Sequence, residues 1–177
     1  MFSSRPSPDP LKGLLAGVAG GLAAAWVMER FQALVPQETF AALLGGGQAG
    51  QQGGDGQEGE PATVKTAEAI SEGVLGHDLT KREKAWAGPA VHYAFGSSVG
   101  AAYGVTAEYA PEVTEGAGLP FGAAVWLLAD EGAVLALGLS DAPWTFPPST
   151  HVYALASHLV YGLTAEGVRR AVRALLG

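Results

Sequence analysis

The chain has 177 residues, of which 48% are hydrophobic and 15% are charged, whereas an average soluble domain has about 25% charged residues. This deficit favours a membrane protein, and the absence of cysteine excludes disulfides, thiolate metal sites and cysteine nucleophiles. The formal net charge of -7 and the pI near 5.0 argue against nucleic acid as a partner, because nucleic-acid binding relies on clustered Lys and Arg.

The first predicted element begins at Asp9 and Pro10, a typical helix start in which Asp caps the N-terminus and Pro takes the first helical position. No charged residue occurs from Gly13 to Met28. The segment approaches the ~20 residues that a transmembrane helix needs. We therefore predict a first membrane span over about residues 11–35.

A change in composition follows the first span. Residues 45–61 read GGGQAGQQGGDGQEGEP, which has too little apolar surface to offset its chain entropy and predicts a flexible linker. Residues 63–75 then repeat apolar side chains at helical spacing, with Lys65 and Glu68 on the opposite face. We expect a short amphipathic helix that packs over the end of a bundle, and Gly76 would end it.

Three further apolar segments complete the chain. Thr80 and Glu83 fit a capping box ahead of a second span over residues 85–107, and the third and fourth spans are expected over 116–140 and 150–173. We predict an all-α fold, a four-span transmembrane helical bundle in one membrane domain. A soluble bundle is the alternative, because the first and fourth spans are short of purely apolar length.

Glycine spacing in the second span indicates close helix packing. Gly96, Gly100 and Gly104 form two overlapping GxxxG units, and small residues at this spacing let transmembrane backbones approach each other. The partner helix can belong to the same chain or to a second copy. A homo-oligomer through the second span is therefore one prediction beside packing within the chain.

Four segments of the chain carry a resemblance to a known family: TVKTAEAISEGVLG, GPAVHYAFGSSVGAAYG, DEGAVLALGLSDAP and HVYALASHLVYGLTAEGVRRAVR. Through them the chain resembles the YagU-like family of small bacterial integral inner-membrane proteins of unknown function. The resemblance implies four spans and a multi-pass location in the bacterial inner (plasma) membrane, with the lipid bilayer as the partner. It brings no activity with it.

Orientation depends on the basic residues that flank the spans, and these are divided equally between the two membrane faces. Positive charges count most within about 15–20 residues of a span end. Lys65 is farther away than that, so we expect both termini to be cytoplasmic.

Five ionisable residues from the four predicted spans form what we call the polar layer. At about 1.5 Å per residue, all five lie roughly 9–15 Å below the same membrane face. They are Glu29, His92, Asp130, Glu131 and His158. Adjacent helical residues point about 100° apart. We therefore predict Asp130 inward and Glu131 toward another helix or another subunit.

Three interpretations of the polar layer compete. The favoured one is structural, with hydrogen bonds between histidines and carboxylates joining the spans. The second is a proton or cation path through Asp130, His92 and His158, since intramembrane acid and histidine chains occur in pumps. The third is a haem or metal ligated by His92 and His158, with Asp130 nearby. No two of these histidines have the tight spacing of a local chelate.

An enzyme has little support in the sequence. Ser97, Ser98 and Ser157 lack a nucleophile elbow, and no HExxH, Walker or dinucleotide-binding motif is present. We therefore expect neither an enzymatic activity nor a bound cofactor.

Overall fold

The structure is a computed structural model that describes residues 7–43, 61–133, 136–138 and 143–177. These residues form helices and no strand, which confirms the all-α class. In chain order the elements are α1 (Pro10–Leu34), α2 (Gln37–Leu43), α3 (Ala62–Ile70), η1 (Ser71–Leu75), α4 (Lys81–Tyr109), η2 (Pro111–Gly118), α5 (Leu119–Val125), η3 (Trp126–Ala133), η4 (Pro143–Thr145) and α7 (Pro148–Leu175). The predicted linker lies outside the described residues, except for Pro61.

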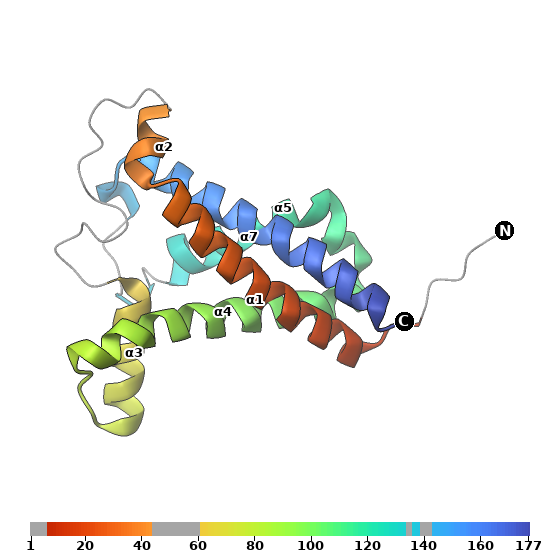
Figure 1. Cartoon of the computed structure of the whole chain (residues 1–177), viewed down its shortest axis with the longest axis horizontal. Coiled ribbons are helices and arrows are strands. Elements are labelled where there is room, and N and C mark those ends of the chain that lie inside the picture. Colours follow the sequence, from red (N-terminus) through yellow and green to blue (C-terminus); the bar gives the residue numbers. More distant parts are fainter. Residues whose placement is uncertain (1–6, 44–60, 134–135, 139–142) are drawn as a thin grey trace.

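The long helices α1, α4 and α7 form the body of the bundle (Figure 1). α1 packs against both α4 and α7, α5 packs on α7, and α3 lies against the start of α4. The start of α1 meets the end of α7, since Lys12 Nζ donates to the Gly177 carbonyl oxygen at 2.6 Å. The start of α1 and the end of α7 therefore lie at the same end of the molecule.

Local chemistry sets the helix starts as predicted. The Asp9 side chain accepts from the Lys12 N–H at 3.1 Å, and Thr80 and Glu83 form the expected capping box. The Thr80 hydroxyl and backbone N–H both donate to Glu83, and with His77 they lower the pKa of this carboxyl to about 2.

The amphipathic helix is present but changes form. It runs as α3 to Ile70 and continues as the π-helix η1 to Leu75. Gly76 then ends it in the left-handed conformation, with φ 62°, as predicted.

The third segment differs from the single helix expected over 116–140. Gly116, Ala117 and Gly118 have φ values of 71°, 56° and 86°, and this left-handed backbone cannot continue a right-handed helix. The α-helix therefore begins only at Leu119 and gives way at Trp126 to the π-helix η3. Residues 134–135 and 139–140 lie outside the described residues.

Two glycine seams let the helix backbones touch. A Cβ added at Gly17 would lie 2.2 Å from the Gly100 carbonyl oxygen, so α1 and α4 are in backbone contact. A Cβ at Gly122 would lie 2.1 Å from the His158 carbonyl oxygen, which places α5 equally close to α7. Gly96, Gly100 and Gly104 all face α1, so the GxxxG stripe is used within the chain.

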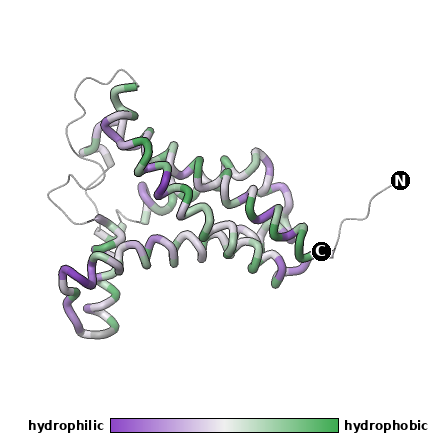
Figure 2. The backbone as a smooth tube through the Cα atoms, viewed as in Figure 1, coloured by the Kyte–Doolittle hydropathy of each residue, from purple (hydrophilic) through white to green (hydrophobic). Residues whose placement is uncertain are grey.

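Apolar length is most marked in α1. Among the described helices it is the one long and apolar enough to cross a membrane, with a mean hydropathy of 1.6 over 18 residues. The long helices α4 and α7 contain more polar residues and fall below that criterion. Strongly hydrophilic residues gather in the hairpin of α3 with the start of α4 (Figure 2).

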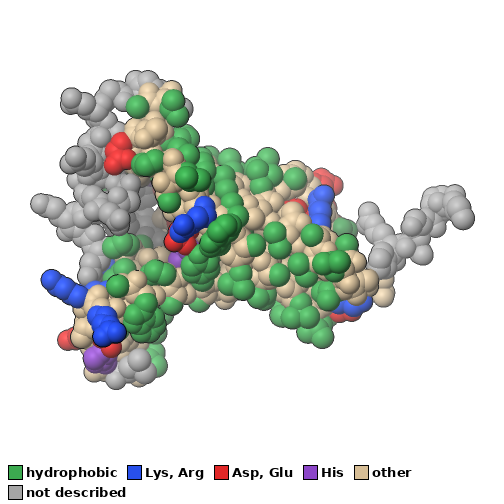
Figure 3. Space-filling view, in the orientation of Figure 1, with side chains coloured by type: hydrophobic (Ala, Val, Ile, Leu, Met, Phe, Trp, Pro, Cys, Tyr) green, Lys and Arg blue, Asp and Glu red, His purple; other side chains and the backbone are tan. Residues whose placement is uncertain are grey.

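On α1, small side chains are buried and several large apolar side chains are exposed. The small residues Ala16, Ala24 and Ala25 are completely buried in α1, whereas Leu15 and Trp26 of the same helix are about half exposed. The largest fully buried side chain among the described residues is that of Glu166. Apolar side chains cover the flanks of the bundle, and most charged side chains lie toward its ends (Figure 3).

Candidate functional site

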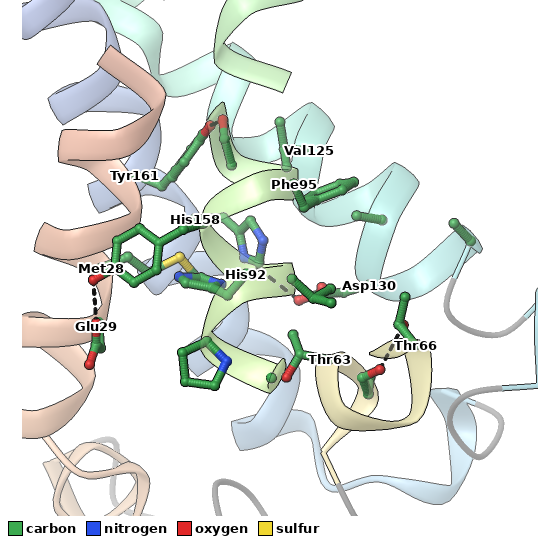
Figure 4. A pocket seen from close by; sticks show the side chains of 18 of the residues that line it. Met28, Glu29, Thr63, Thr66, His92, Phe95, Val125, Asp130, His158 and Tyr161 are labelled. Atoms are coloured by element: carbon green, nitrogen blue, oxygen red, sulfur yellow. Dashed lines mark hydrogen bonds and ion pairs between the residues drawn. The ribbon is translucent and has the colours of Figure 1, made fainter. Parts of the chain in front are cut away.

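The candidate site is a cavity of about 570 Å³ at the end of the bundle where α3 lies. It is lined by residues of α1, α3, α4, α5, η3 and α7, so each long helix contributes to its wall. Figure 4 shows His92, Asp130 and His158 around it, with the aromatic rings of Phe95 and Tyr161. Glu29 lies at its edge on α1. Four of the five residues of the predicted polar layer therefore share one cavity.

Asp130 is the least satisfied of these groups. Its Oδ2 lies 3.6 Å from His158 Nδ1, which is beyond hydrogen-bond distance. The carboxylate has no hydrogen-bond partner within the described part of the chain, and its side chain is 41% exposed. Asp130 thus points inward, as predicted, and presents free acceptor oxygens to the cavity (Figure 4).

Glu131 lies outside the cavity and meets α7. Its Oε1 lies 2.6 Å from His151 Nδ1, so the prediction of a contact with another helix holds within one chain. His151 and His158 are two helical turns apart on one face of α7. Adjacent carboxylates of η3 therefore lie near successive histidines of α7, but only Glu131 is within hydrogen-bond distance of its histidine.

Glu29 and His92 are tied to neighbouring helices. The Tyr93 hydroxyl donates to Glu29 Oε2 at 2.6 Å, and Arg30 contacts Oε1 at 3.0 Å. His92 Nε2 lies 3.4 Å from the Ala25 carbonyl oxygen of α1. Unlike the carboxylate of Asp130, that of Glu29 therefore already has both a donor and a counter-charge.

A second cavity of about 550 Å³ adjoins the first. The two share Met28, Glu29, Gln32, Asp130 and His158 as lining residues. The second extends toward Gln37 of α2 and Thr150 of α7. Asp130 and His158 therefore stand where the two cavities meet.

A second polar cluster, centred on Glu166, escaped the sequence analysis. Tyr103 donates to Glu166 Oε2 at 2.9 Å, Arg169 binds both carboxylate oxygens at 2.7 and 2.9 Å, and Arg170 binds Oε1. Glu166 is 1% exposed. The spacing of three and four residues between Glu166 and the two arginines is typical of ion pairs within a helix and could have been recognised in the sequence. The contact with Tyr103, 63 positions away in α4, could not.

The same end of the bundle contains a further ion pair. Arg173 donates to both Glu108 oxygens, at 2.7 and 3.2 Å, and the Asp9 N–H donates to Glu108 at 3.0 Å. These contacts join α1, α4 and α7. The arginines that flank the predicted fourth span are therefore engaged by carboxylates rather than free.

The metal interpretation gains nothing from the arrangement. Within the described segments, no three His, Asp or Glu side chains are grouped so that they could hold a metal ion. His92 and His158 instead direct ring nitrogens toward backbone carbonyl oxygens.

Comparison with known proteins identifies a family and no function. A family model described as a protein of unknown function (DUF1440) matches residues 61–167. No curated protein and no solved structure matches the chain. The expected membership of an uncharacterised family is confirmed, and the YagU-like name for it stays a prediction.

Proposed function

The chain belongs to the DUF1440 family of proteins of unknown function, and from that premise we propose an integral-membrane bundle that binds a cation in its cavity. The cation enters from one membrane face, and a proton is the simplest case. The observation that carries the proposal is the Asp130 carboxylate, without a hydrogen bond among the described residues and facing a 570 Å³ cavity between two histidines.

The burial of small residues and the exposure of large apolar ones on α1 support an integral-membrane bundle. Without a hydrophobic force between helices in lipid, transmembrane helices associate through small residues and polar contacts, and large apolar side chains face the acyl chains. The buried face of α1 is glycine and alanine, and its exposed face includes Leu15, Leu22 and Trp26. Polar side chains of α4 and α7, including Tyr103 and His158, turn inward. This explains how helices of moderate hydropathy can lie in lipid.

Location and orientation follow as proposals. The start of α1 and the end of α7 lie together, so the chain must cross the membrane an even number of times. The resemblance implies the bacterial inner membrane. Both termini are proposed to be cytoplasmic. Because the chain lacks cysteine, Gly177→Cys supplies a single label site. Labelling by an impermeant maleimide in intact spheroplasts would contradict this orientation, and labelling only after lysis agrees with it.

The charge of the cavity supports a cation. Among the described residues, the ionisable side chains that line the two cavities are acids, histidines and three tyrosines, with no Lys or Arg. An anion would meet Asp130 and Glu29 with no counter-charge inside the cavity. A cation instead supplies the charge partner that the described residues do not give to Asp130.

The structural interpretation fits other residues better. Glu131 and His151 are in direct contact at 2.6 Å, and Glu166 is saturated by Tyr103 and arginines. Groups that only join helices are expected to be satisfied in this way. Asp130 is not.

The test is cation movement in liposomes that contain the full chain under a pH gradient. Wild type should show uptake of protons or of another monovalent cation, and Asp130→Asn, similar in shape but unable to ionise, should abolish it. Glu131→Gln is the matched control, because Glu131 lies next in η3 but outside the cavity, and it should retain uptake. If no monovalent cation, inorganic or organic, moves in an Asp130-dependent way, the proposal fails.

A further inference from the structure

We propose that the cation bound by the cavity is a primary ammonium group on an apolar body, held by Asp130. This inference rests on the proposed function and names the class of its ligand. Four properties of the cavity carry it: the hydrogen bonds already made by its hydroxyl groups, the tautomers of its histidines, its charge and its size.

Three of the hydroxyl groups that line the cavity already donate their protons to other groups of the protein. Tyr161 and Thr66 donate to backbone carbonyl oxygens at 2.6 and 2.7 Å, and Tyr93 donates to Glu29 at 2.6 Å. A hydroxyl has one proton and two lone pairs. Toward the cavity these groups can therefore act only as acceptors.

The histidines are acceptors for the same reason. His158 Nδ1 lies 2.9 Å from the Ala154 carbonyl oxygen, and His92 Nε2 lies 3.4 Å from the Ala25 carbonyl oxygen. A carbonyl oxygen only accepts, so in the neutral rings these nitrogens carry the proton. The opposite nitrogen of each ring, Nε2 of His158 and Nδ1 of His92, is left with a lone pair. The neutral rings thus add acceptors and no free donor.

A ligand that pairs with Asp130 and with these neighbouring acceptors must supply both charge and N–H donors. A primary ammonium provides one positive charge and three donors, enough for Asp130 and two neighbouring acceptors. A quaternary ammonium provides the charge without the donors. A neutral alcohol provides one donor without the charge, and a carboxylate provides neither.

Size and apolar lining point to an organic cation. Ligand pockets for small molecules measure about 300–1,000 Å³, and this cavity of about 570 Å³ lies within that range. Bare metal cations prefer several oxygen ligands in a tight shell, and the described residues offer no such group. Met28, Phe95, Val125 and Leu137 instead supply an apolar wall for a hydrocarbon body.

The experiment compares hexylamine with three probes of similar length: hexyltrimethylammonium, hexan-1-ol and hexanoate. Equilibrium dialysis and thermal unfolding use the full chain in detergent, as wild type, Asp130→Asn and Glu131→Gln. Hexylamine should bind wild type and Glu131→Gln and raise Tm, and Asp130→Asn should weaken its binding at least about tenfold. The other three probes should not distinguish the three proteins, because any partition into detergent is common to all.

The outcomes separate this inference from the proposed function. Hexylamine binding that depends on Asp130 supports both. Equal, Asp130-dependent binding of hexyltrimethylammonium overturns the requirement for N–H donors. If hexylamine does not bind while liposomes show Asp130-dependent uptake of protons or alkali cations, the organic ligand is wrong and the proposed function stands. If neither binding nor uptake depends on Asp130, both are wrong.

Discussion

Two acidic sites lie at opposite ends of the bundle and differ in how far their hydrogen bonds are satisfied. Glu166 is buried and receives donors from Tyr103, Arg169 and Arg170. Asp130 faces a cavity, with one histidine at 3.6 Å. The cost of burying Glu166 is offset by donors of the protein, whereas Asp130, with its side chain 41% exposed, opens onto the cavity with acceptors unused. The comparison indicates that unused acceptors distinguish a ligand-binding carboxylate from a structural one.

The largest expected effect is the loss of the satisfied cluster. Glu166→Ala leaves the buried Arg169 guanidinium and the Tyr103 hydroxyl without their acceptor, and should lower the free energy of unfolding by about 3–5 kcal/mol. Asp130→Ala should lower it by less than about 1 kcal/mol, because that side chain opens onto the cavity. Reversible unfolding in mixed detergent measures both. Equal losses would erase the distinction between the two sites.

A backbone contact between Gly122 of α5 and His158 of α7 lies next to the cavity that contains Asp130. Gly122→Ala would place a Cβ 2.1 Å from the His158 carbonyl oxygen, forcing α5 away from α7 at a cost of about 1–3 kcal/mol. The movement should also weaken cation binding, since Asp130 follows α5 in the chain. Gly167→Ala is the control in α7, because its Cβ would meet nothing within 4 Å. A Gly122→Ala protein as stable as this control would contradict the close seam.

A smaller effect should come from one hydrogen bond of the satisfied cluster. Tyr103→Phe removes the donor at 2.9 Å from Glu166 but keeps the stacking on Phe121, whose ring centroid lies 4.0 Å away. We expect a loss of about 0.5–1.5 kcal/mol in unfolding free energy, with cation binding unchanged. Tyr109→Phe, at an exposed position near the end of α4, should change neither quantity. A change in cation binding by Tyr103→Phe would link the two sites.

The smallest effect concerns the start of α4, the helix that bears His92. Hydrogen bonds from Thr80 lower the pKa of Glu83 from 4.5 to about 2, so ionised Glu83 favours the folded cap. Its contribution is complete above pH 4.5 and is lost as pH falls through about 2. Protection of the amides in the first turn of α4, taken relative to their intrinsic exchange rates at each pH, should therefore fall over that interval. In Glu83→Gln this fall should be absent.

Much of the local structure could be predicted because its causes lie within a few residues. The caps at Asp9 and Thr80 and the stop at Gly76 depend on side chains and glycine conformation close by in the chain. The late start of the third segment at Leu119 could not be predicted in this way. Ala117 adopts a positive φ that alanine does not favour, so tertiary contacts must hold it there.

The sequence predicted which residues share the candidate site better than it predicted the contacts that they make. Helical rise and alternating direction brought Glu29, His92, Asp130 and His158 to one depth, because these quantities follow from residue count alone. The partner of Glu131 depended on the π-helical form of η3, which lets both neighbouring carboxylates reach α7. An ordinary helical angle of about 100° per residue left the partner of Glu131 open between another helix and another subunit.

The sequence by itself determined an all-helical chain, the starts of α1 and α4, and the glycine and polar residues available for packing, since each depends on neighbouring residues or simple periodicity. Only the tertiary structure decided which polar groups would be satisfied. Tyr103 reaches Glu166 across 63 positions, whereas no comparable donor reaches Asp130 within the described chain. Hydrogen-bond satisfaction is a property of distances between helices, and the glycine seams set those distances through backbone contacts that no single helix specifies.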